Sequence, residues 1–542
     1  MGQTPQRLLL KLLPHPGFAT PSVRANLRPL FDTSANGRAA SELALESGRP
    51  AWYLANLTNM EANPWDSAHS RVGDALGIDH SAILFAEPDL PQSYLDRNEV
   101  NPRGSAQALK KQSCDPKPQC KDQRPAGPGF AWHLRDEYSQ LSSARASVSF
   151  SDPDRTRIAH IDTGYDASHC ARPARLLLDL QRNFVSADHN PNNATDPDRN
   201  RLFDTSGHGT GTAGILAGSK VAQNNGEFLG GAPDADILPV RIANSVVLFY
   251  TSTFAQGINY ALQQNCDVVS ISMGGLPSAA WNETVNHAYL AGMCIVAASG
   301  DCFGGLPSHH VVYPARYHRT LAACGVMANG QPYFNLPLDV LEGSWGPASC
   351  MSSALAAYTP NTSWARFGCP QTIDMDGAGT SSATPQIAAA VALWYEKYKT
   401  QLPRDWRRVE AVRNALFRSA KNADPCYFGK GILQARAALD VTPQLDLPQT
   451  PPDDDSLPFL RVITGRAISA ATPRERMLDL ELCQRYLRNR ELQTAVPDPA
   501  VAPSKEKLRE FLDAVIEDKG ASNTLRKEMS VRYLALVGAL AT

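Results

Sequence analysis

Three short stretches place a carboxylate, an imidazole and a hydroxyl among small residues, and together these groups can carry out acyl transfer. Asp162 ends the apolar run 157–162 and is followed by Thr-Gly. His208 lies in Gly-His-Gly-Thr-Gly-Thr-Ala-Gly, and Ser381 lies in Gly-Thr-Ser-Ser-Ala-Thr-Pro. A serine hydroxyl is a weak nucleophile until a neighbouring base takes its proton, and histidine is the usual base. The small flanking residues would let a substrate backbone come close to all three groups.

The position of Ser381 within its stretch also favours chemistry. Pro385 is followed by a long, Ala-rich apolar run. This run predicts a buried helix, because proline is tolerated in a first helical turn. Ser381 would then lie at a helix N-terminus, where free backbone N–H groups favour negative charge such as an oxyanion. A serine that only caps a core helix gives the same local pattern, so this stretch alone leaves both interpretations open.

The three motifs follow one another in the order Asp, His, Ser, and in this order they resemble the subtilases, the subtilisin-like serine proteases, for which the order is known. The resemblance covers roughly residues 130 to 440. It implies a doubly wound, mostly parallel α/β fold. It also implies that Ser381 is the nucleophile of an acyl-enzyme mechanism, that His208 is its base, and that Asp162 orients and stabilises the imidazole.

The resemblance extends to the oxyanion hole, with one departure. The family pattern Ala-Ala-Gly-Asn ends in an asparagine whose amide donates to the oxyanion, whereas here the run 298–301 ends in Asp301. We expect Asp301 and the backbone of Ser381 to form the oxyanion hole. An ionised carboxylate cannot donate, so three accounts stay open. Asp301 is protonated through burial, another group or water replaces it, or the enzyme is weak or inactive.

Two backbone segments are expected to bind the substrate. In the family, a Ser-X-Gly-Gly segment pairs with the peptide as an added strand, and the pocket floor comes from the residue before a Tyr-Pro pair. That residue is Val312, where glycine is frequent in the family, so we expect a short pocket that disfavours large aromatic side chains. The predicted substrate-binding residues are Ser270, Ser272, Met273, Gly274, Gly275, Ala298, Ser299, Gly300 and Val312.

The composition is that of an ordinary globular protein of two or three domains. The 542 residues carry a net charge of -2, with 43% hydrophobic and 20% charged residues. No basic surplus points to nucleic acid, and no run of about 18 apolar residues points to a membrane span. The N-terminal stretch is interrupted by Lys11 and has no small-residue cleavage site, so it is a poor signal peptide. We therefore expect a cytoplasmic protein with no nucleic-acid or membrane partner.

The cysteines are odd in number, and most of them lie in apolar runs, which predicts reduced core thiols. Cys114 and Cys120 lie close together in a Pro/Lys-rich segment and could pair or bind a metal ion, but no second Cys/His pair has zinc-finger spacing. We predict no cofactor and no metal site, apart from structural calcium at unknown positions. Asp196 and Asp198 are no better calcium candidates than any polar loop.

Alternating strands and helices are expected in the body of the chain. The strands are predicted at 157–161, 235–241, 268–272, 293–298 and 320–326. The helices are predicted at 209–217, 252–263, 284–291, 406–419 and 431–439. Before the body, strands are predicted at 7–13, 51–57 and 81–89 with a helix at 65–76, and after it helices are predicted at 473–490, 504–519 and 522–540. Apolar strands joined by crossover helices make a doubly wound sheet.

The chain is expected to form five consecutive segments. These are a propeptide-like α+β domain at 1–92, a linker at 93–130, the subtilisin-like catalytic domain at 131–440, a Pro/Asp-rich linker at 441–458 and a helical module at 459–542. The family's propeptide is an intramolecular chaperone and inhibitor, and the first segment resembles it in position and in its strand ending Ala-Glu-Pro-Asp. A substrate-recruiting domain is the alternative. A maturation cut, if there is one, should fall between 93 and 130.

The sequence thus predicts a serine endopeptidase that cleaves protein or peptide substrates. The absence of a secretion signal favours a regulated intracellular processing protease, a zymogen whose own N-terminal domain or a partner holds it in check. The C-terminal helices would pack or bind a protein partner. The alternative is a catalytically weak or inactive peptide-binding homologue, disabled by Asp301.

Overall fold

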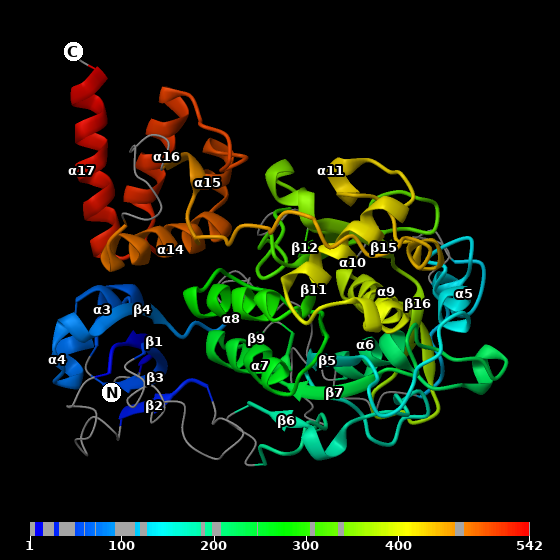
Figure 1. Cartoon of the computed structure of the whole chain (residues 1–542). Coiled ribbons are helices and arrows are strands. Elements are labelled where there is room, and N and C mark those ends of the chain that lie inside the picture. Colours follow the sequence, from blue (N-terminus) through cyan, green and yellow to red (C-terminus); the bar gives the residue numbers. More distant parts are fainter. Residues whose placement is uncertain are drawn as a thin grey trace.

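The computed structural model describes the chain in thirteen ranges. They are 6–14, 26–31, 49–58, 60–70, 72–92, 114–119, 127–185, 190–197, 207–246, 248–303, 309–333, 341–460 and 471–540. A large α/β body lies beside a small N-terminal sheet, and a group of C-terminal helices lies next to that sheet (Figure 1). Most of the predicted linker at 93–130 falls outside the described residues.

Seven parallel strands form the central sheet, in the order β15-β13-β11-β10-β5-β7-β6. Their bounds are β5 Arg157–Asp162, β6 Arg182–Asn183, β7 Asp236–Arg241, β10 Val268–Ile271, β11 Cys294–Ala298, β13 Leu321–Val326 and β15 Ala354–Tyr358. The five predicted strands and the predicted fold class are confirmed. The strands β6 and β15 were not predicted, because one has two residues and the other is rich in alanine.

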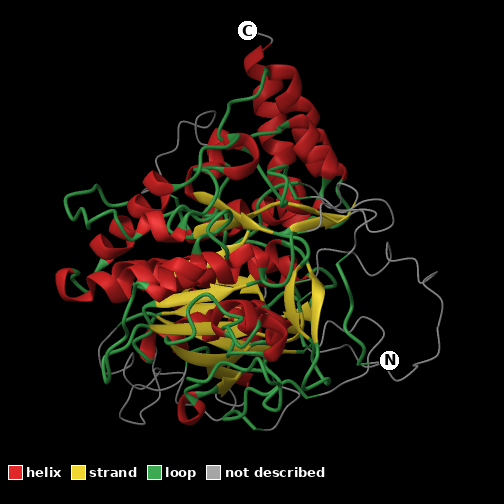
Figure 2. Cartoon of the chain, turned by 90° about the vertical axis from the view of Figure 1, so that its right-hand side faces the viewer, coloured by secondary structure: helices red, strands yellow, loops and turns green. Residues whose placement is uncertain are grey.

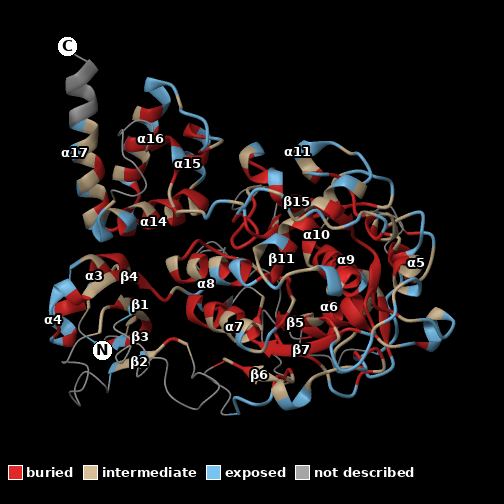
Figure 3. Cartoon of the chain, viewed as in Figure 1, coloured by how far each residue is buried: buried red, intermediate tan, exposed pale blue. Residues whose placement is uncertain are grey.

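Helices cover both faces of this sheet, as continuous apolar strands require (Figures 1 and 2). One layer holds α5 Leu141–Ala146, α6 His208–Ala217, α9 Thr380–Tyr398, α10 Trp406–Ser419 and α12 Ala435–Ala438, and the other holds α7 Thr251–Gln263 and α8 Ala279–Leu290. Successive residues of β5 point to opposite layers: Ile158 joins the apolar cluster of Ile387 on α9, and Ala159 joins that of Phe254 on α7. Helix α9 is buried along nearly its whole length (Figure 3).

Two predicted helices differ from the structure. Helix α8 begins at Ala279, five residues before the predicted start, because the side chain of Ser278 caps it by accepting from Trp281 N–H. The helix predicted at 431–439 is reduced to α12, because Ile432 forms β-bridges with Ala356 and Lys421.

Short strands and turns complete the body. The strands are β8 Ala243–Ser245, β9 Leu248–Phe249, β12 Asp301–Phe303, β14 Leu341–Gly343, β16 Thr362–Ala365 and β17 Ile373–Gly377, and they pair as β8-β9, β12-β14 and β16-β17. One further short helix is α11 Pro425–Phe428. The 3-10 turns are His80–Ala82, Trp132–Leu134, Leu178–Leu180, Ala222–Asn224, Ala348–Ser353 and Lys399–Gln401.

The N-terminal sheet has four antiparallel strands in the order β2-β3-β1-β4. Their bounds are β1 Gln6–Leu12, β2 Leu27–Pro29, β3 Ala51–Leu57 and β4 Ile83–Pro88, and two short helices follow β3 as α3 Pro64–Ser70 and α4 Val72–Leu76. The predicted α+β character is therefore confirmed, although the helix predicted at 65–76 is two helices.

Two buried carboxylates join this sheet to the body. Asp89 accepts hydrogen bonds from the backbone N–H and the hydroxyl of Ser252 in the first turn of α7. Glu87 accepts from the hydroxyl of Ser278 and from the N–H groups of Ala279 and Ala280 at the start of α8. Burial raises the pKa of Glu87 to about 8 and also raises the pKa of Asp89. The hydrogen bonds to the free N–H groups at both helix N-termini therefore orient the sheet against these helices.

The C-terminal helices are α14 Pro473–Arg488, α15 Arg490–Ala495, α16 Lys505–Glu517 and α17 Asn523–Leu540. They pack against the N-terminal sheet, with α14 beside α3 (Figure 1). Trp65 donates its indole N–H to Gln484 at 2.9 Å, and His69 Nε2 lies 3.0 Å from Glu481. No helix within the described ranges is both long and apolar enough to cross a bilayer.

The Pro/Asp-rich segment at 441–458 runs along the body rather than free of it. Asp455 accepts from Asn282 and Tyr317, and Asp453 accepts from the backbone of His318. Sequence reading expected a plain linker here because its prolines and aspartates are breakers, but the aspartates bind specific partners on the body.

The pairing proposed for Cys114 and Cys120 is wrong. Cys114 forms a disulfide with Cys369, 255 residues away, and Cys120 lies outside the described residues. Contacts of this range leave no spacing signal in the sequence, which is why the pairing was missed.

Candidate active site

Asp162 and His208 form a hydrogen-bonded pair at the carboxyl edge of the central sheet. Asp162 is the last residue of β5 and His208 is the first residue of α6. The distance between His208 Nδ1 and Asp162 Oδ1 is 2.8 Å, and the aspartate is 1% exposed. The imidazole thus donates its Nδ1–H to a buried carboxylate, which leaves Nε2 as the nitrogen that can accept a proton.

A close approach of glycines holds the two motifs together. Gly207, which precedes α6, has φ +84°, and a Cβ on Gly209 would lie 2.0 Å from the carbonyl oxygen of Gly164. Asp196 accepts from Gly207 N–H at 2.7 Å and from the Thr163 hydroxyl at 3.3 Å. Asp196 is therefore engaged in joining the two motifs and does not fit a calcium ligand, and Asp198 lies outside the described residues.

The surroundings of Asp162 keep it ionised. Burial alone would raise the pKa of Asp162, but the charge and hydrogen bond of His208, with smaller help from His160 and Thr163 N–H, hold it below its ordinary value. Thr212 also donates its hydroxyl to Asp162 at 3.1 Å. Burial lowers the pKa of His160, whose Nε2 is 2.9 Å from the Thr212 hydroxyl, so His160 serves as a neutral neighbour.

Ser381 lies in the first turn of α9, as the sequence predicts. Gly379, with φ +79°, precedes the helix. The Ser381 hydroxyl donates to the carbonyl of Ser272 at 3.2 Å, and the Ser272 hydroxyl donates to the carbonyl of Ser381 at 2.9 Å. Ser272 follows β10, and the pairing of Ile271 with Ile161 puts Ser272 level with Asp162 on the neighbouring strand. The nucleophile is thus about one strand spacing from the Asp–His pair.

The Ser381 hydroxyl and His208 Nε2 are not hydrogen-bonded to each other. His208 Nε2 is buried and has no hydrogen-bond partner among the described residues. Such bonds are often unformed in the absence of substrate. Rotation of the serine side chain about its Cα–Cβ bond would turn the hydroxyl away from Ser272.

Asp301 binds the helix that carries the nucleophile. Its Oδ1 accepts the backbone N–H of Thr380 at 3.0 Å, and a Cβ on Gly379 would lie 2.8 Å from its Oδ2. Burial raises the pKa of Asp301 to about 6, although the hydrogen bonds from Thr380 and the charge of His208 act in the opposite direction. The side chain keeps partial exposure to solvent.

Val312 fills the space between the two predicted substrate segments. Its methyl carbons lie 2.4 Å and 2.7 Å from the positions that a Cβ would take on Gly274 and Gly300. Gly275 and Tyr313 exchange backbone hydrogen bonds of 2.7 and 3.0 Å, which fixes this floor against the first segment. The geometry agrees with a short pocket.

Not every predicted substrate residue exposes its side chain. The residues of the predicted site that keep partial exposure are His208, Gly274, Gly300, Asp301 and Ser381. The side chains of Ser270, Ser272, Met273, Ala298 and Ser299 are buried, so we expect any contact of these residues with a substrate to involve their backbone, and their assignment stays a prediction. Ser270 and Ala298 lie inside β10 and β11, and Ser299 donates to the carbonyl of Ser344.

Several neighbours of the site could not be predicted from the motifs. His160 and Thr212 contact Asp162. Asp196 instead bonds the neighbours of the Asp–His pair, Thr163 and Gly207. Trp364 packs edge-on against the His208 ring, with centroids 5.6 Å apart, and lies where a side chain at Gly211 would be. The glycine at 211 is the one sequence signal of this contact, and it does not identify the tryptophan.

The sequence and the fold were compared with those of known proteins. Residues 154–435 match the model of the Subtilase family. The chain belongs to the subtilase family. This subtilase is 29% identical to subtilisin DY of Bacillus licheniformis and 30% identical to subtilisin of Bacillus pumilus, in each case over 52% of this chain and 90% of the relative. It is 28% identical to thermitase of Thermoactinomyces vulgaris, over 52% of this chain and 88% of that protein.

Among solved structures, the prenylagaramide maturation protease PagA aligns with 56% of this subtilase and 96% of that chain, with a TM-score of 0.42 and 21% identity. That likeness is too distant to bear on function. The family and its curated members make this subtilase a serine endopeptidase.

Proposed function

We propose that the protein cleaves peptide bonds through Asp162, His208 and Ser381, with an acyl-enzyme intermediate on the serine. The observation that carries the proposal is the orientation of the imidazole. A buried, ionised Asp162 accepts the Nδ1 proton of His208, and Nε2 has no partner within the described chain. A base in this tautomer is ready to take a proton from Ser381.

Each step of the proposed reaction has a group suited to it. His208 Nε2 takes the proton of the Ser381 hydroxyl while Oγ attacks the substrate carbonyl carbon. The oxyanion receives the N–H of Ser381 at the positive end of α9 and the proton of a neutral Asp301. The tetrahedral species then collapses, and the imidazolium gives its proton to the leaving amine. His208 then takes a proton from a water molecule, which attacks the acyl-enzyme and releases the acid product.

The N-terminal domain is proposed to act as an inhibitor and chaperone of the same chain. Its buried Glu87 accepts a hydrogen bond from the start of α8, and its buried Asp89 accepts one from the start of α7. Beyond them, Gln92 accepts from Leu276 N–H at 2.8 Å, next to the predicted substrate segment. This contact supports a zymogen that matures by a cut between 93 and 130.

The regulated intracellular role and cytoplasmic location remain proposals. The Cys114–Cys369 disulfide points towards an oxidising compartment, because such bonds are rare in the cytosol. For the C-terminal helices, exposed Val531 and Leu534 on α17 support the proposal of a protein partner.

Two observations favour the alternative of a weak or inactive peptide-binding homologue. Asp301 carries a carboxyl group where the family has an amide, and the Ser381 hydroxyl is bonded to Ser272. Labelling of the nucleophile separates the two functions. The full-length protein, Ser381→Ala and His208→Ala are treated with a fluorophosphonate between pH 5 and 9, and intact masses are measured.

We expect one adduct on the wild type, none on Ser381→Ala and strongly slowed labelling of His208→Ala. Ser382→Ala is the matched control, because Ser382 is the neighbouring buried serine and its loss should leave labelling intact. Equal labelling of the wild type and His208→Ala, or none at any pH, would contradict the proposal. Clipping between 93 and 130 that is absent from Ser381→Ala would support self-maturation.

A further inference from the structure

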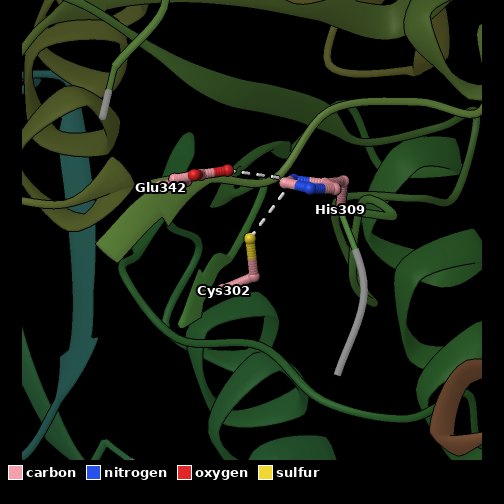
Figure 4. A group of neighbouring side chains, drawn as sticks. All are labelled: Cys302, His309 and Glu342. Carbon is pink, nitrogen blue, oxygen red and sulfur yellow. Dashed lines mark hydrogen bonds and ion pairs between the residues drawn. The ribbon is translucent and has the colours of Figure 1, made fainter. Parts of the chain in front are cut away.

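The side chains of a cysteine, a histidine and a glutamate converge (Figure 4). The cysteine, Cys302, directly follows Asp301 in the chain. Cys302 on β12 and Glu342 on β14 are paired residues of this antiparallel ladder, and His309 comes from the chain after β12. Cys302 Sγ lies 3.3 Å from His309 Nδ1, and Glu342 Oε2 lies 3.4 Å from the same nitrogen. One ligand atom from each of the three residues lies within 4.8 Å of the others.

The distances fit a shared metal ion. Zinc bonds of about 2.0–2.3 Å in a tetrahedron separate neighbouring ligand atoms by about 3.3–3.7 Å. Both contacts to Nδ1 fall within or next to that range. Small side-chain rotations would bring the thiolate and the carboxylate to the same separation.

The arrangement does not suit a second catalytic triad. A nucleophile–histidine–carboxylate relay uses the two different ring nitrogens, whereas here the thiol and the carboxylate both approach Nδ1. The Cys302 side chain is also fully buried, so it could not attack a substrate. As a purely hydrogen-bonded group, the thiol and the carboxylate would have to share one ring nitrogen.

The chemistry of the donors indicates the class of metal. Thiolate, imidazole and carboxylate together suit zinc and similar divalent transition ions, whereas calcium and magnesium prefer oxygen alone. The side chains of His309 and Glu342 are 35% and 30% exposed, which gives an ion access from solvent. Trp345 stacks on the His309 ring with centroids 5.1 Å apart and fixes its plane.

We propose that Cys302, His309 and Glu342 bind one divalent transition-metal ion of the zinc class, with water completing the coordination. This departs from our prediction of no metal site, because ligands from separate strands leave no spacing motif. Binding releases the thiol proton and forms a metal–sulfur bond. The ion would join β12 to β14 next to the pairing of Asp301 with Gly343, and so would hold the oxyanion-hole segment in place.

Cobalt titration tests the site in the full-length chain. Ser381→Ala is the background, so that self-cleavage does not disturb the sample, and the protein is prepared metal-free with reduced thiols. We expect one equivalent of Co²⁺ to bind with thiolate-to-cobalt charge-transfer absorption, and Zn²⁺ to displace it. Cys302→Ser should abolish that absorption, and Glu342→Gln and His309→Gln should each weaken binding about tenfold or more.

Cys426→Ser is the matched control, because Cys426 is an exposed thiol outside this group and its loss should change nothing. Far-UV circular dichroism checks that each variant is folded. If Cys302→Ser does not fold, Glu342→Gln still tests the proposal. Unchanged cobalt absorption in Cys302→Ser, equal loss in Cys426→Ser, or no binding at micromolar Co²⁺ would each overturn the proposal.

Discussion

Replacement of Asp301 by asparagine should change the pH dependence of peptide hydrolysis. The side chain keeps its size, and its Oδ1 can still accept from Thr380 N–H. The amide N–H, unlike an ionised carboxylate, donates at every pH. If a neutral Asp301 donates to the oxyanion in the wild type, the variant should match it in acid and exceed it in alkali.

The magnitude follows from the pKa of Asp301, which burial raises to about 6. With that value, about 90% of the carboxyl is protonated at pH 5, about a tenth at pH 7 and about 1% at pH 8. The ratio of kcat/KM between Asp301→Asn and the wild type should therefore be about 1 at pH 5, about 10 at pH 7 and about 100 at pH 8. The upper limit is about 10²–10³, the loss measured when such a donor is removed from a subtilisin.

The assay is hydrolysis of one chromogenic peptide between pH 5 and 9, at constant ionic strength and with the same metal content for both proteins. Active sites are counted by fluorophosphonate labelling. The acid limb of each profile is fitted separately before the ratio is taken, because the charge of His208 acts on Asp301. Asp301→Ala, which has no donor, should stay about 10²–10³ below Asp301→Asn throughout. A ratio that does not change with pH would refute the role of a neutral Asp301.

Three further changes have expected outcomes. Val312→Gly should raise kcat/KM for large aromatic P1 residues by at least about tenfold, with little change for alanine at P1, and parallel changes for both substrates would contradict the short pocket. The double substitution Glu87→Ala and Asp89→Ala should weaken docking of the N-terminal domain on the body and raise the rate of peptide hydrolysis. If limited proteolysis shows that the domain is displaced from the body but the rate is unchanged, the domain is not an inhibitor. Loss of the Cys114–Cys369 disulfide by double serine substitution should lower the free energy of unfolding by about 2–4 kcal/mol in denaturant titration, whereas no change in protein purified without reductant would mean that the bond does not form.

Asp162, His208 and Ser381 could be singled out because each lies in a local motif whose small residues have a physical reason to be there. Asp162 ends an apolar strand, and Ser381 lies in the first turn of a long buried helix. The same local reasoning placed the strands of the parallel sheet, whose apolar runs are buried on both faces.

Local reasoning fell short where the outcome depends on residues distant in sequence. Ser270 was assigned to the substrate because it lies near a motif, but its side chain is inside β10, where the sheet and its helices exclude solvent. Cys114 was compared with its neighbour in sequence, although its partner is Cys369. In the sequence, Asp196 is indistinguishable from other polar loop residues. Its hydrogen-bond partners, Gly207 and Thr163, are distant in sequence and are brought to it only by the fold.

One kind of contact occurs three times between the N-terminal domain and the rest of the molecule: a buried carboxyl group of the domain accepts hydrogen bonds from N–H groups at a helix N-terminus. Glu87 accepts from the start of α8 and Asp89 from the start of α7, both in the body. Asp66 accepts from the N–H groups of Asn523 and Thr524 at the start of α17. Because the body and the C-terminal helices hold the domain from two sides, a single cut between 93 and 130 would leave both sets of contacts intact. If the domain covers the cleft, as we propose, access would then depend on separating the domain from the C-terminal helices as well as on cutting the chain.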